Sequence, residues 1–149
     1  MALADRFVRW QGQAIAQLSF AINLFLGFAV TALAFTLSFL RESSFTPSRC
    51  YAFLYLLSLV LLSAAALCGI GAVVTRLLDF RATANKVRLR QQYPISAEIA
   101  VLGDYATGLG KATWRLFWFM LGGFTLGIAC FAISFFSVYG ERVLRAAGL

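Results

Sequence analysis

The sequence predicts an all-α integral membrane protein with three transmembrane helices. Three long runs lack any charged residue, namely residues 10–40, 50–75 and 116–140. Each run exceeds the roughly 20 apolar residues that a helix needs to cross a hydrocarbon core. Composition agrees, because 61% of the 149 residues are hydrophobic and 13% are charged, whereas soluble domains average about 25% charged residues. We expect a single membrane bundle over residues 1–149.

The first span is expected at residues 18–40. Small and polar residues recur along it at helical spacing and share one face: Gly12, Ala16, Ser19, Asn23 and Gly27. In lipid, close packing of small residues and side-chain hydrogen bonds drive helix association. We therefore expect this face to pack on another helix, with Asn23 hydrogen-bonded across the contact. The alternative is that Asn23 lines a pore.

The second span is expected at residues 50–75. Thr46 followed by Pro47 predicts the start of its helix, as an N-cap residue and a first-turn proline. Beyond the span, neither glycine nor proline interrupts the helical pattern before Pro94. Helix two is therefore predicted to extend into the cytoplasm as far as Tyr93.

The cytoplasmic segment, residues 76–113, is predicted to end in a short amphipathic helix that precedes the third span. Its apolar residues recur at spacings of four and three: Ile95, Ile99, Leu102, Ala106 and Leu109. The glycines at 103, 108 and 110 are expected to weaken or break this helix.

The third span is expected at residues 116–140. Gly123 and Gly127 form a small-x-x-x-small motif, which serves equally well for dimerisation or for packing within one chain.

The basic residues predict the topology. Nine of them fall on one side of the membrane: Arg6, Arg9, Arg76, Arg81, Lys86, Arg88, Arg90, Lys111 and Arg115. The other side has four: Arg41, Arg49, Arg142 and Arg145. The positive-inside rule places the nine in the cytoplasm, so we expect a multi-pass protein of the cell (inner) membrane with its N-terminus cytoplasmic and its C-terminus outside.

Six of these basic residues are candidates for contact with anionic lipid: Arg81, Lys86, Arg88, Arg90, Lys111 and Arg115. The lipid bilayer is accordingly the first expected partner. Nucleic acid is not expected as a partner, because the aromatic interleaving of single-strand binders is absent.

The chain is poor in residues for catalysis or metal binding. It has no histidine, which removes the commonest general base and metal ligand. Its three cysteines are widely separated without a C-x-x-C spacing, and none of its six acids lies at the middle of a predicted span. We expect no enzyme activity, no cofactor and no metal.

Two functions remain. The first is an oligomerising or accessory subunit that associates with itself or with a larger membrane protein, as the small-residue stripes indicate. The second is a homo-oligomeric pore, channel or membrane-disrupting effector, as polar residues on the first span indicate. The candidate helix-packing or pore-lining residues are Gln13, Gln17, Ser19, Asn23, Gly27, Gly123 and Gly127, and Thr31 continues the polar series.

Overall fold

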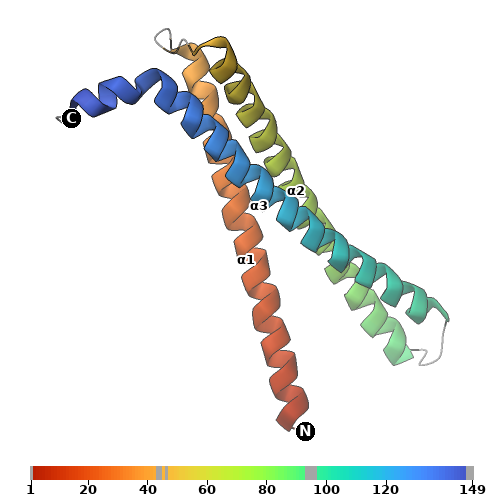
Figure 1. Cartoon of the computed structure of the whole chain (residues 1–149). Helices are drawn as coiled ribbons and strands as arrows, with labels where there is room; N and C mark the ends of the chain where they lie inside the picture. The colour runs from red at the N-terminus through yellow and green to blue at the C-terminus, as the bar shows by residue number, and fades with distance from the viewer. Residues whose placement is uncertain (1, 43–44, 46, 93–96, 147–149) are drawn as a thin grey trace. The chain divides into compact units, whose positions relative to one another are not determined.

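The computed structural model describes residues 2–42, 45, 47–92 and 97–146, and the side chains of residues 13, 15–42, 45, 47–89 and 99–140. In this part of the chain every regular element is helical (Figure 1). The elements are α1 (Ala2–Ser38), the short 3-10 helix η1 (Phe39–Arg41), α2 (Arg49–Gln92) and α3 (Ala97–Ala146). The predicted all-α class is confirmed for these residues.

Three helical stretches are long and apolar enough to cross a membrane: Ile15–Arg41, Arg49–Leu89 and Ile99–Gly140. The predicted spans at 18–40, 50–75 and 116–140 lie within them. Length and composition therefore indicate a membrane location.

The prediction of a separate amphipathic helix before the third span is wrong. α3 runs without a break from Ala97 to Ala146. Glycine costs a helix only about 1 kcal/mol relative to alanine, and no proline falls within α3. Lys86 of α2 lies against Gly103, while Gly108 and Gly110 have open space at their Cβ positions.

α2 begins later than the sequence predicts. Its first residue is Arg49, and the backbone N–H of Ala52 donates to the carbonyl oxygen of Ser48 at 2.8 Å. The predicted cap Thr46 lies outside the described residues, as does Tyr93 just beyond the last residue of α2, Gln92.

The chain divides into two compact units, and each long helix contributes a segment to both. Unit 1 joins the part of α1 that ends at Phe25 to Cys68–Trp118. Unit 2 joins Leu26–Leu67 to the part of α3 that starts at Phe119. The expected single bundle over 1–149 stays a prediction.

In unit 2, α3 lies close to α2 at two glycines. A Cβ atom built on Gly127 would lie 2.9 Å from Leu62 Cγ, and one on Gly123 would lie 3.3 Å from the carbonyl oxygen of Leu61. Leu62 is fully buried and Ala65, which also borders Gly123, is nearly so. The small-x-x-x-small motif of α3 thus packs against α2 of the same chain.

Hydrogen bonds and aromatic rings complete unit 2. The Tyr55 hydroxyl of α2 donates to the Thr36 carbonyl of α1 at 2.6 Å, and the Ser134 hydroxyl of α3 donates to the Tyr51 carbonyl of α2 at 3.1 Å. Around them lies a cluster of aromatic rings with centroids 5.0–6.4 Å apart, made of Phe35, Phe39, Phe45, Tyr55, Phe131, Phe135 and Tyr139.

Alanine substitutions at two glycines of α3 should have opposite effects on stability. Gly127→Ala forces Leu62 to move and should cost about 1–3 kcal/mol, as overpacking does. Gly122 has open space where its Cβ would be, so Gly122→Ala should stabilise by about 1 kcal/mol or less through helix propensity. Thermal unfolding in mild detergent measures both. If both variants shifted the unfolding temperature equally and in the same direction, the close contact at Gly127 would be contradicted.

Candidate functional site

Unit 1 brings α2 and α3 together around a polar contact. The Thr75 and Thr113 hydroxyls lie 2.9 Å apart and share a hydrogen bond. One turn away, a Cβ on Gly71 would lie 3.3 Å from Leu116 Cδ1. Thr113 is buried. Interhelical hydrogen bonds and small residues stabilise helix pairs in apolar surroundings. This contact therefore holds α2 against α3 at the residue that precedes Arg76.

Arg76 places a positive charge inside unit 1. Its side chain is 13% exposed, and its Nη1 lies 3.7 Å from Asp79 Oδ2, one helical turn further on. The guanidinium carbon lies 4.8 Å from the centroid of the Phe80 ring. Both contacts stabilise the positive charge of the guanidinium.

Two of the three guanidinium nitrogens lack a partner. Nε and Nη2 of Arg76 are buried and form no hydrogen bond with the described residues. These two nitrogens share one edge of the guanidinium, the edge that can bind a carboxylate or phosphate with two parallel hydrogen bonds. The Asp79 contact is made through the remaining nitrogen, Nη1, so that edge is available.

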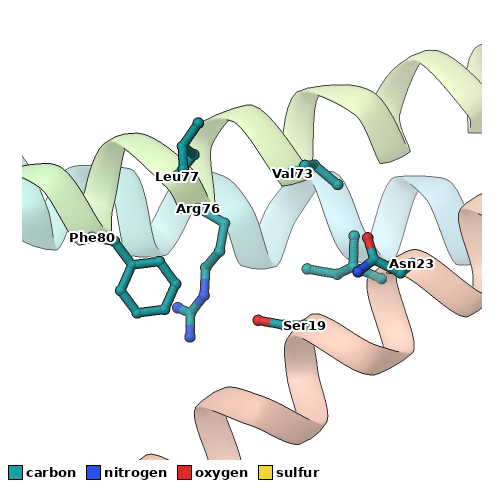
Figure 2. A pocket seen from close by; sticks show the side chains of 7 residues that line it. Ser19, Asn23, Val73, Arg76, Leu77 and Phe80 are labelled. Atoms are coloured by element: carbon teal, nitrogen blue, oxygen red, sulfur yellow. The ribbon is translucent and has the colours of Figure 1, made fainter.

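A cavity of about 220 Å³ adjoins this side chain. Figure 2 shows Ser19 and Asn23 of α1 on one side and the Arg76 guanidinium on the other, with the Phe80 ring beside it. The remaining lining is apolar and consists of Ile22 of α1 with Val73 and Leu77 of α2. One cation and two neutral polar groups therefore line an otherwise apolar space.

A second cavity, of about 470 Å³, also reaches Arg76. Its other lining residues come from α1 and α3: Ile15, Gln17, Leu18, Ala21, Trp114 and Phe117. Among the described lining residues, Arg76 is the one that both cavities share.

The structure separates the predicted packing and pore candidates into three groups. Ser19 and Asn23 line the smaller cavity, while Gln17 lines the larger one. Gln13 is exposed, and Gly27 has open space at its Cβ position. Gly123 and Gly127 pack against α2.

The predicted lipid-contact residues are mostly exposed. Lys86 differs, because its Nζ lies 2.7 Å from the Cβ position of Gly103, against α3. The side chain of Arg90 lies outside those described. The exposed members are Arg81, Arg88, Lys111 and Arg115.

Sequence analysis did not select Arg76 as a site residue. It names Arg76 only among the nine basic residues that set the topology. Arg76 lines its two cavities together with residues of α1 and α3, and these contacts between distant segments have no signature in the local sequence. The usable signal is that Arg76 directly follows a 26-residue run without charge, since basic residues at such depths are costly and often functional.

No protein family model, no curated protein and no solved structure matches this chain. Among the described residues, no group of three or more acidic or cysteine side chains could hold a metal ion. Function is therefore inferred from the geometry of the chain itself.

Proposed function

We propose that this chain is a three-span membrane protein that acts as a self-associating subunit, with α1 as the contact between copies. The observation that supports the proposal is a contrast between two helices. Gly123 and Gly127 of α3 pack against α2, whereas the outward residues of α1 are exposed in the part of the chain that the structure describes.

The uncovered residues of α1 follow a regular pattern. Spacings alternate between four and three, and every member is exposed: Gln13, Gln17, Phe20, Leu24, Gly27 and Thr31. We call this set the outer seam. Alternation of four and three is the spacing by which two helices pack along their length in a left-handed supercoil.

The chemistry of the outer seam favours a second copy of the same helix. Glutamine amides donate and accept hydrogen bonds, so Gln13 and Gln17 can pair with their own counterparts across a two-fold axis. Gly27 lets two backbones approach closely, as small residues do in membrane helix pairs. In the accessory-subunit form of this proposal, a larger membrane protein docks on the same seam.

The proposed orientation follows the basic residues. With the N-terminus in the cytoplasm of a cell with an inner membrane, α2 beyond Thr75 and the first part of α3 lie on the cytoplasmic side. The exposed Arg81, Arg88, Lys111 and Arg115 then face anionic headgroups. We propose no catalytic role.

Substitution of Gly27 tests the self-association. Gly27→Leu adds bulk to the outer seam at a position where a Cβ has no neighbouring atom within 4 Å from another described element, so it should convert the assembly to monomer while thermal unfolding of the monomer is unchanged. Mass measurement of the intact complex in mild detergent reports the copy number. Gly122→Leu is the matched control on α3, also with open space, and should leave the assembly intact.

A wild-type protein that is monomeric, or a Gly27→Leu protein that assembles as the wild type does, would contradict the proposal. Gly27 is preferred to Asn23 for this test, because Asn23 also lines the cavity at Arg76 and its substitution would mix two effects.

A pore is the second candidate, favoured by the exposure of Gln13, Gln17 and Thr31 along one seam. If several α1 helices surround a central axis, these polar side chains line the pore. Because they are uncharged, such a pore would select weakly among ions. Ion flux through liposomes separates the two functions. An assembled protein without flux supports the subunit, and flux that disappears in Gly27→Leu supports the pore.

Single-cysteine labelling tests the orientation. In a background without Cys50, Cys68 and Cys130, an impermeant thiol reagent added to intact cells should label Ser48→Cys and not Arg88→Cys. Both positions are exposed in the structure, so protection reports the side of the membrane rather than burial. The reverse pattern would invert the topology.

A further inference from the structure

The positive charge of Arg76 is only partly neutralised by the described residues of unit 1. Its distance to the Asp79 carboxylate, 3.7 Å, exceeds the roughly 2.7–2.9 Å of a charge-assisted hydrogen bond. The Nε–Nη2 edge has no acceptor among the described residues. Buried charges in proteins are paired or hydrogen-bonded, because an unpaired one is costly. The site therefore lacks an anionic acceptor on that edge.

The smaller cavity has the size and polarity for such an acceptor. Its volume of about 220 Å³ is below the roughly 300–1,000 Å³ of pockets that enclose drug-sized ligands. A single headgroup is therefore a better fit than a whole metabolite. Ser19 and Asn23 supply a hydroxyl and an amide on the wall opposite Arg76 (Figure 2). The Asn23 amide can donate hydrogen bonds, whereas the Ser19 hydroxyl donates to the Ile15 carbonyl at 3.1 Å and rotates to donate to a ligand.

We propose that Arg76, Ser19 and Asn23 form a binding site for the phosphate group of a membrane phospholipid, held between α1 and α2. A guanidinium edge binds phosphate oxygens with two parallel hydrogen bonds, which a lysine cannot reproduce. Asp79 occupies the Nη1 side of the guanidinium, and its carboxylate orients the guanidinium without blocking the Nε–Nη2 edge.

The lining favours a lipid over a free phosphate ion. Val73, Leu77 and Phe80 border the cavity and are 38%, 55% and 48% exposed. Exposed apolar side chains next to a cationic site suit a ligand that has acyl chains attached to its anionic group. Arg76 directly follows the charge-free run 50–75, which places it at the level of the headgroups. This step depends on the membrane insertion proposed above and not on self-association.

Lipid binding to the full-length protein tests the site. Native mass spectrometry counts bound molecules of phosphatidylglycerol, with diacylglycerol as the lipid without phosphate. Arg76→Gln should weaken phosphatidylglycerol binding about tenfold or more, the factor expected for loss of a charge-assisted contact. Arg49→Gln removes an equal charge from an exposed position of the same helix, outside the proposed lipid contacts, and should bind as the wild type does. Arg76→Lys should fall between the two.

A second variant leaves the arginine in place. Ser19→Leu fills the cavity from α1 and should also weaken binding, so the proposal stays testable if Arg76→Gln does not fold. Equal binding by wild type, Arg76→Gln and Ser19→Leu would overturn the site, as would equal binding of diacylglycerol. If excess inorganic phosphate displaced the lipid, the assignment of the bound phosphate group to a phospholipid would be wrong. Copy number, measured in the same spectra, reports self-association separately.

Discussion

The close approach of α2 and α3 is the constraint on which the rest of the structure depends. In unit 2 the backbone of α3 comes so near at Gly123 and Gly127 that a single added Cβ would meet Leu61 or Leu62. In unit 1 the same two helices share the Thr75–Thr113 hydrogen bond. α3 packs Gly123 and Gly127 against α2 of the same chain, whereas Gln13, Gln17 and Gly27 of α1 are exposed. This is why the proposed association surface lies on α1.

The same pairing explains how a charge can be held in unit 1. Arg76 directly follows Thr75, whose hydroxyl shares a hydrogen bond with Thr113 of α3, and its side chain is 13% exposed. Asp79 and Phe80 hold the guanidinium from their own helix, and Ser19 of α1 lies across the cavity. The energetic cost of this arrangement is reduced if an anion binds the remaining guanidinium edge.

Sequence was sufficient for the helical class and for the three apolar stretches, because long charge-free runs constrain both. It failed where the outcome depends on contacts distant in the chain. Gly103, Gly108 and Gly110 indicate a break, yet α3 is continuous through them, because glycine costs a helix only about 1 kcal/mol relative to alanine. Gly27 and Gly127 look alike in sequence, although one faces open space and the other faces Leu62. Arg76 counts in the sequence only as one basic residue of nine, since nothing local reveals the cavities that it lines with α1 and α3.

Disulfide cross-linking in the native membrane tests the central claim most directly. In a cysteine-free background, Gly27→Cys places a thiol on the outer seam and Gly122→Cys places one on an uncovered position of α3, both with open space in the chain. The account predicts that mild oxidation converts the Gly27→Cys protein to a covalent dimer and leaves the Gly122→Cys protein monomeric. A dimer formed through position 122 and not through position 27 would contradict it.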